Sequence, residues 1–215
     1  LFGPKREDFN IGGRAKAFFK PDNLRNLVDF LKFFGNKEKI FILGAGSNIL
    51  IKDNGFDGVV IKLGKNFSKL SILPNKNIIA GSATIDKKVA EFAVQNEVGG
   101  LEFLSCIPGS VGGGIKMNSG CFGSEFKDVL ASVQAVDREG KVFTIPSSKI
   151  EFEYRKTKLP KELIFLSASF KGNFKKRDLA KKDMEVFIKR KEETQPTRVK
   201  TSGSTFKNPI NQTNE

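Results

Sequence analysis

The stretch "IPGSVGGG", residues 107–114, places four glycines and one serine around a proline within eight positions. A glycine run removes packing atoms and raises the entropy cost of ordering the backbone. Such a run is therefore expected where a ligand comes close to the main chain or where the chain turns sharply. The wider segment from Leu101 to Gly123 holds six glycines. A simple turn does not need that many, so the segment favours a ligand-binding role.

A second small-residue segment, "LGAGSN", occupies residues 43–48 after a short apolar stretch. Adjacent backbone N–H groups in such a loop can bind a phosphate, and Ser47 and Asn48 add side-chain donors. The segment is not a Rossmann fingerprint, because Ile49 stands at the third glycine position and no helical pattern follows; nor is it a P-loop, since it lacks "GK[ST]". An ordinary tight turn remains the alternative for this segment alone. Two such loops in one chain suggest an extended ligand with phosphates and a flat ring system.

Charge and composition narrow the class of protein. The net charge is +13, and Lys supplies most of it along the whole chain. With a single Tyr and no Trp for base stacking, a solvated basic surface that attracts an anionic substrate is preferred over a nucleic-acid binder. No apolar run approaches the ~20 residues of a membrane span, and no signal-peptide pattern is present, so we expect neither a membrane association nor secretion.

Two residue types constrain the chemistry. The two cysteines, Cys106 and Cys121, match neither a zinc spacing nor a disulfide framework, which favours a reducing, cytoplasmic setting. Histidine is absent. A Ser-His-Asp triad, a Cys-His dyad and a His-ligated metal are therefore excluded, and we expect no metal site. An enzyme of this composition must use other acids and bases or a cofactor.

Hydrophobic periodicity predicts a mixed α+β protein. Helices are predicted over 22–35, 86–96 and 178–194, single strands over 40–43, 78–80 and 163–170, and a hairpin over 131–145. The apolar stretches 49–51 and 59–63 flank a "KDNGFDG" turn, which suggests that they pair with each other. Strands and helices do not alternate regularly, so α+β is favoured over a doubly wound sheet.

Four blocks together resemble the family of UDP-N-acetylenolpyruvoylglucosamine reductases. They are "LGAGSNILIKDNGFDGVVIKL", "IPGSVGGGIKMNSGCFG", "YRKT" and "SGSTFKNP", in the order of the family. The resemblance implies an FAD-binding fold of the vanillyl-alcohol-oxidase (PCMH) type. It implies two subdomains, residues 1–64 and 65–195, followed at 196–215 by the start of a substrate-binding domain. The absence of a Tyr-bearing insertion before the last block is similar to the shorter, type II branch.

The resemblance also implies roles for individual residues. The cofactor pyrophosphate would lie on Gly44, Ala45, Gly46, Ser47 and Asn48. The flavin would lie against Gly109, Ser110, Gly112 and Gly113, and the cofactor would also contact Pro108, Asn118 and Gly120. Arg155 matches the arginine that holds the substrate carboxylate, and Ser204 matches the proton-donating serine. Tyr154, Lys207 and Asn208 match positions near the substrate.

The implied chemistry relies on FAD and NADPH. Hydride passes from NADPH through the flavin to the enolpyruvyl double bond of a UDP-sugar enolpyruvyl ether, in peptidoglycan precursor synthesis. The protein then supplies orientation, charge stabilisation and one proton, which is consistent with the missing histidine. A monomer without nucleic-acid or membrane partners is expected.

Several positions depart from the pattern of the family. Thr157 replaces a serine, Cys106 stands at a position that is commonly glycine, and "NSGCFG" replaces a typical "NAGAYG". The family continues beyond "FKNP" with a stretch that carries a glutamate partner of Arg155, and no residue here matches it. We therefore expect a C-terminally truncated chain that binds flavin without reducing substrate. A non-catalytic FAD-binding remnant and another FAD oxidoreductase of the same fold, such as a sugar-acid oxidase, are the alternatives.

Overall fold

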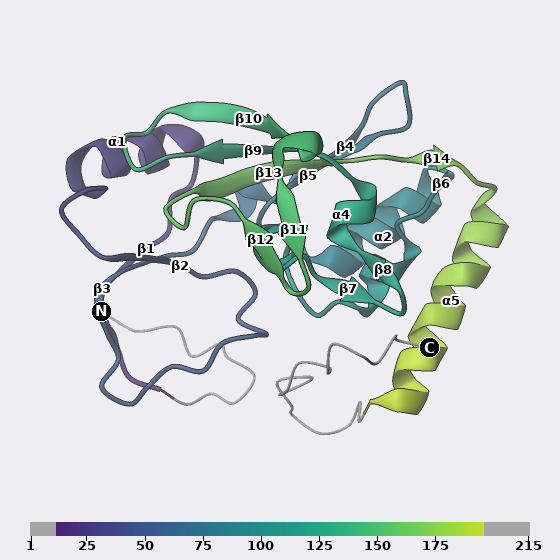
Figure 1. Ribbon diagram of the computed structural model, residues 1–215, viewed down its shortest axis with the longest axis horizontal. Coiled ribbons are helices and arrows are strands. Elements are labelled where there is room, and N and C mark those ends of the chain that lie inside the picture. Colours follow the sequence, from purple (N-terminus) through teal and green to yellow (C-terminus); the bar gives the residue numbers. More distant parts are fainter. Residues whose placement is uncertain (1–11, 196–215) are drawn as a thin grey trace.

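Two β-sheets form the frame of the molecule in a computed structural model that describes residues 12–195. The first is a parallel sheet in the order β1-β3-β2, with strands Ala15–Phe19, Phe56–Ile61 and Ile40–Ile42. The second is antiparallel, in the order β10-β9-β13-β5-β4, with strands Val142–Pro146, Leu130–Val136, Ile164–Phe170, Ile78–Gly81 and Leu70–Ile72. The first sheet lies at one end of the molecule in Figure 1, and the long helix α5 lies at the other.

Helices and short strand pairs surround the sheets. The helices are α1 (Leu24–Phe34), α2 (Asp86–Gln95), α3 (Val111–Met117), α4 (Phe126–Val129) and α5 (Arg177–Thr194), with 3-10 turns at Lys65–Phe67, Glu102–Cys106 and Ser147–Lys149. The short pairs are β7 (Gly120–Cys121) with β8 (Ser124–Glu125), β11 (Glu151–Glu153) with β12 (Lys156–Lys158), and β6 (Val98–Gly99) with β14 (Asn173–Phe174). The β11–β12 hairpin lies at the centre of the molecule in Figure 1, between the two ends.

Two hydrophobic clusters hold these elements together. The larger one fills the space between the five-stranded sheet and helices α2 and α3. The smaller one packs Leu27 and Leu31 of α1 against Val59 and Ile61 of β3, and it also takes in Leu166 of β13. Because this cluster includes residues of both sheets, burial of apolar surface fixes one sheet relative to the other.

Most predicted elements are confirmed, and so is the α+β class. The three predicted helices appear as α1, α2 and α5, and the hairpin appears as β9 and β10. The side chain of Asn23 accepts a hydrogen bond from the Asn26 N–H at 2.9 Å, so it caps the first turn of α1. The hydrophobic spacing and the turn residues were sufficient for these elements.

The predicted pairing of 49–51 with 59–63 is wrong. Residues 49–51 form no strand, whereas β3 pairs in parallel with β1 on one side and with β2 on the other. Both edges of β3 are therefore occupied, and no hydrogen-bonding edge is left for a neighbour in sequence. The strand from Ala15 to Phe19, which was not predicted, takes one of these edges.

The glycine run is not a loop throughout, because its second half lies in helix α3. Glycine is unfavourable in a helix by about 1 kcal/mol relative to alanine. The helix packs closely because a Cβ on Gly114 would lie 2.1 Å from the Phe126 ring, while Val111 and Ile115 are fully buried. Tertiary packing therefore outweighs the low helix propensity. Asn118 ends the helix in the left-handed conformation, with φ of 41°.

No helix within residues 12–195 is long and apolar enough to cross a membrane. The residues assigned to a substrate-binding domain, 196–215, lie outside the described part of the chain. The division into subdomains at residue 64 stays a prediction.

Candidate functional site

The loop 44–48 follows β2, and its backbone N–H groups have no acceptor among residues 12–195. The N–H of Leu43 still bonds to the carbonyl of Ile61 at 2.9 Å. Among the described residues, none accepts a hydrogen bond from the backbone N–H groups of residues 44–48. Gly46 has φ of 89°, a conformation that favours glycine. Such a row of N–H groups suits an anionic ligand.

This loop meets the glycine-rich segment at Ser110. A Cβ atom added to Gly44 would lie 2.8 Å from the Ser110 hydroxyl oxygen. The segments 43–48 and 107–114 are therefore neighbours in space. An apolar pocket that includes Leu43, Leu50 and Phe56 adjoins the loop and could hold a flat ring.

A third segment completes the polar surface. Residues 82–86 run alongside 109–112: the N–H of Val111 donates to the Thr84 carbonyl at 2.9 Å, and that of Gly112 donates to the Ser82 carbonyl at 2.8 Å. The hydroxyls of Ser82, Thr84 and Ser110 are buried and have no partner within the described part of the chain. Buried polar groups are normally hydrogen-bonded, so three orphaned hydroxyls fit the polar groups of a cofactor such as FAD.

Asp86 begins α2 next to these hydroxyls. Its carboxyl group is fully buried, and neither oxygen has a partner among residues 12–195. Desolvation by burial raises the pKa of Asp86 well above its usual range. A Cβ on Gly109 would lie 2.8 Å from Oδ2 of Asp86. The carboxyl group is therefore favoured in its neutral form, which can donate a hydrogen bond beside the glycine-rich segment.

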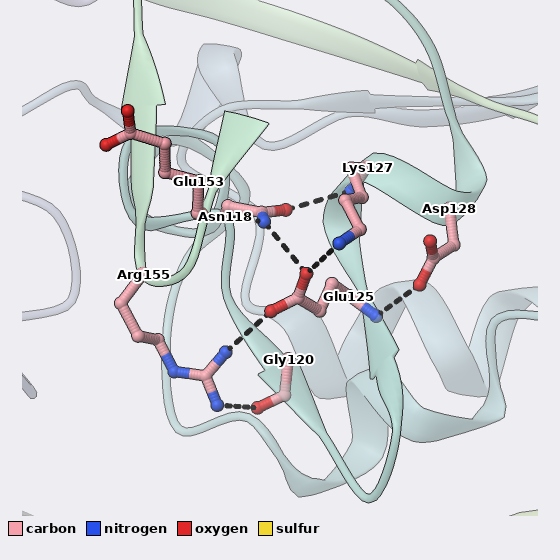
Figure 2. Close-up of polar contacts among 7 residues, drawn as sticks. All are labelled: Asn118, Gly120, Glu125, Lys127, Asp128, Glu153 and Arg155. Atoms are coloured by element: carbon pink, nitrogen blue, oxygen red, sulfur yellow. Dashed lines mark hydrogen bonds and ion pairs between the residues drawn. The ribbon is translucent and has the colours of Figure 1, made fainter. Parts of the chain in front are cut away.

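Arg155 lies in the turn of the β11–β12 hairpin, with φ of 54°. A positive φ is costly for a residue other than glycine, and such strain is common at functional sites. Figure 2 shows the contacts of its guanidinium group: Nη1 lies 3.3 Å from Oε1 of Glu125, and Nη2 donates to the Gly120 carbonyl at 3.1 Å. Its Cζ lies 4.8 Å from the centre of the Tyr154 ring. Two hydrogen-bond acceptors and one aromatic ring thus fix the orientation of the guanidinium plane.

The hairpin is attached to the glycine helix by Thr157. Its hydroxyl donates to the carbonyl of Ile115 in α3 at 2.6 Å, and the contact is buried. The threonine that departs from the family pattern therefore has a structural role here. It holds the strand after Arg155 against the helix that follows Ser110. Arg155 also borders a surface pocket, which is lined by Gly120, Cys121, Phe122, Gly123, Ser124, Glu125, Lys127 and Asp128.

The remaining predicted site residues are placed differently. Asn118 is buried, and its side chain is engaged with Glu125, with the Glu153 carbonyl and with the Lys127 N–H. Gly120 accepts the bond from Arg155, and Pro108 is exposed. The flavin roles of these residues stay predictions. Three others, Ser204, Lys207 and Asn208, lie outside the described residues.

Sequence reasoning missed four residues of this region: Ser82, Thr84, Asp86 and Glu125. A lone hydroxyl or carboxylate in a soluble protein carries no distinguishing sequence signal. Only "SEF", directly after the glycine-rich segment, could have drawn attention to Glu125. No group of three or more His, Cys, Asp or Glu among residues 12–195 could hold a metal ion.

The two cysteines also approach each other beside the site. Interaction with the Cys121 side chain is the main reason that the pKa of Cys106 is lowered to about 7, while burial opposes this shift. The same interaction and burial raise the pKa of Cys121. Both cysteines are free thiols.

Comparisons with known proteins agree on one family. A family model described as "FAD binding domain" matches residues 15–146. The UDP-N-acetylenolpyruvoylglucosamine reductase of Pelagibacter ubique is 63% identical over 207 residues, which cover 96% of this chain and 68% of that protein. The protein of the same name from Rickettsia massiliae is 44% identical over 203 residues, covering 94% of this chain and 68% of that protein.

Solved structures agree with these matches. The crystal structure of the UDP-N-acetylenolpyruvylglucosamine reductase of Thermus caldophilus matches with a TM-score of 0.85 at 27% sequence identity. The matched region covers 97% of this chain and 74% of the Thermus caldophilus chain. A crystal structure of the Cu,Mo-CO dehydrogenase matches with a TM-score of 0.55 at 10% sequence identity, over 76% of this chain and 61% of the dehydrogenase chain. At this identity the match supports the fold alone. The predicted PCMH-type fold is confirmed.

Proposed function

Because this chain belongs to the family of UDP-N-acetylenolpyruvoylglucosamine reductases and carries an FAD-binding domain, we propose that the native protein that contains this sequence reduces UDP-N-acetylglucosamine enolpyruvate to UDP-N-acetylmuramate. NADPH is the proposed reductant, and peptidoglycan precursor synthesis is the proposed setting. The observation that carries the proposal is the contact between the 44–48 loop and Ser110. The hairpin that bears Arg155 is held at the same site by the hydrogen bond from Thr157 to helix α3.

The residues present fit FAD. The N–H groups of residues 44–48, which no described residue accepts from, would hold the pyrophosphate, as in other anion-binding loops. The orphaned hydroxyls of Ser82, Thr84 and Ser110 would satisfy their hydrogen bonds on the cofactor. Asp86, favoured in its neutral form, would add a donor without repelling a phosphate. FAD supplies hydride transfer when it is bound, and the chain supplies position and charge.

Arg155 is the proposed binding group for the substrate carboxylate. A planar guanidinium holds a carboxylate through two parallel hydrogen bonds, and the same charge stabilises negative charge that develops on that carboxylate. Tyr154 lies against the guanidinium, and it is proposed to contact the substrate together with Lys207 and Asn208. Ser204 is the proposed proton donor.

Anaerobic half-reactions of the native protein test this function. The FAD-loaded protein is first reduced with NADPH and then mixed with UDP-N-acetylglucosamine enolpyruvate, while the visible flavin absorbance is followed. We expect NADPH to bleach the flavin and the enolpyruvyl substrate to restore its absorbance. FAD binding without recovery would favour a non-catalytic flavoprotein. Recovery with a sugar acid, but not with the enolpyruvyl ether, would favour another oxidoreductase of this fold.

A further inference from the structure

The two carboxylate oxygens of Glu125 have different partners: one contacts Arg155, and the other contacts Asn118 and Lys127. Oε2 accepts a hydrogen bond from Asn118 Nδ2 at 3.1 Å and forms an ion pair with Lys127 Nζ at 2.7 Å. Oε1 lies 3.3 Å from Arg155 Nη1 (Figure 2). The carboxylate is therefore fixed from one side and directed at the guanidinium from the other.

The support behind Glu125 is rigid and independent of Arg155. Asn118 is fully buried, and besides Glu125 it bonds to the Glu153 carbonyl at 3.2 Å and to the Lys127 N–H at 3.0 Å. The backbone N–H of Glu125 donates to Asp128 at 2.8 Å. The Glu125 side chain is only 17% exposed. Loss of the Arg155 contact alone would leave these bonds in place.

Arg155 still has donors to offer after these contacts. A guanidinium carries five N–H groups. Two are used, one toward Glu125 and one toward the Gly120 carbonyl, and no other described residue accepts from this side chain. The remaining donors, which include Nε–H, can bind a second carboxylate while the first contacts keep the plane of the group fixed.

We propose that Glu125 is a positioning residue, which acts through Arg155 and orients its free N–H groups toward the substrate carboxylate. This inference rests on the proposed function, in which Arg155 binds that carboxylate. Misplacement of a binding group by about 1 Å can reduce a rate by up to ~10²-fold, so orientation alone has a measurable effect.

The first experiment compares Glu125→Gln with Glu153→Gln in the native FAD-loaded protein. Glu153 lies in the same hairpin as Arg155 and pairs with Lys156 and Lys158 instead. We expect Glu125→Gln to slow flavin reoxidation by the enolpyruvyl substrate about 10- to 100-fold. Flavin reduction by NADPH should stay unchanged. The control should leave both steps unchanged, and equal behaviour of the two variants would overturn the inference.

A double-mutant cycle separates positioning from a general structural role. If Glu125 acts only through Arg155, Glu125→Gln should have no further effect on reoxidation in an Arg155→Lys background. Additive losses would overturn the inference. Glu125→Asp keeps the charge with a shorter reach, and we expect it to recover part of the rate.

The orientation of Arg155 can also be measured without turnover. In protein labelled with ¹⁵N-arginine, rotation about the Cζ–Nη bonds of Arg155 should be slow in the wild type and in Glu153→Gln, and faster in Glu125→Gln or Glu125→Asp. Unchanged rotation in both Glu125 variants would contradict the positioning role. Failure of the FAD-loaded wild type to react with the enolpyruvyl substrate would refute the proposed function instead. The rotation measurement would still decide whether Glu125 orients Arg155.

Discussion

The Ser110 hydroxyl oxygen lies 2.8 Å from the position that a Cβ atom on Gly44 would occupy. This approach joins the loop after β2 of one sheet to the segment before α3, which packs on the other sheet. A side chain at position 44 would require the Ser110 hydroxyl to shift. Gly44 thus allows close contact between two parts of the chain, in addition to its proposed role in cofactor binding.

Replacement of Ser110 by alanine should affect the apoprotein and the holoprotein differently. The hydroxyl is buried, has no hydrogen-bond partner among residues 12–195 and makes no capping bond to α3. An unsatisfied buried hydroxyl destabilises the fold, so Ser110→Ala should raise the melting temperature of the apoprotein slightly or leave it unchanged. The increase in melting temperature on adding FAD should become smaller, because one hydrogen bond to the cofactor is lost.

Ser105→Ala is the matched control for this prediction. The Ser105 hydroxyl already donates to the Glu102 carbonyl at 2.7 Å. Its removal should destabilise the apoprotein by about 1 kcal/mol and leave the FAD-induced shift unchanged. Thermal melting with and without FAD measures both variants. An undiminished FAD-induced shift in Ser110→Ala would contradict the assignment of this serine to the cofactor.

Arg155→Lys should affect the two half-reactions unequally. Lysine keeps the positive charge but cannot form two parallel hydrogen bonds to a carboxylate. We expect reoxidation by the enolpyruvyl substrate to fall by about 10²-fold, while flavin reduction by NADPH changes little. Stopped-flow absorbance of the flavin follows each step separately. Equal slowing of both steps would instead indicate a structural role, or a role in the nicotinamide step.

The sequence was informative where local signals agree with the fold. Periodicity and turn residues were sufficient for α1, α2, α5 and the β9–β10 hairpin. The sequence was not informative where contacts between residues remote in sequence determine the structure. The pairing of β3 depends on two strands that are remote in sequence, and the helix at Val111–Met117 depends on the packing of Gly114 against Phe126.

The candidate site shows the same limit. Its glycine-rich loops and Arg155 could be predicted, because they stand in recognisable blocks. The partners Glu125, Ser82, Thr84 and Asp86 could not, because their importance arises from burial and from neighbours that are distant in sequence.

Asp86→Asn should change how stability depends on pH. Burial raises the pKa of Asp86 well above its usual value near 3.8, so the folded apoprotein binds this proton more tightly than the unfolded chain does. The contribution of the neutral carboxyl is therefore fully present below the unfolded pKa and is lost as the pH rises toward the folded pKa. Asparagine does not ionise. The stability of Asp86→Asn relative to the wild type should rise with pH above about 4, by up to ~1.4 kcal/mol per pH unit.

Urea denaturation of the two apoproteins at a series of pH values checks this prediction. Below the unfolded pKa the difference in the free energy of unfolding should be constant. A difference that stays constant up to neutral pH would show that Asp86 is ionised in the folded protein, and the proposed neutral donor beside the cofactor would be wrong.

Whether the 44–48 loop holds FAD is decided by the dissociation constant for FAD of the Gly46→Val variant. Gly46 has φ of 89°, and the control Gly100 has φ of 93° with nothing within 4 Å of an added Cβ. Gly100→Val therefore introduces the same positive-φ backbone strain as Gly46→Val, but outside the 44–48 loop. We expect Gly46→Val to bind FAD at least about tenfold more weakly than the wild type, while Gly100→Val keeps its affinity. Equal affinity of Gly46→Val and the wild type, measured on folded apoproteins by flavin fluorescence titration, would contradict it.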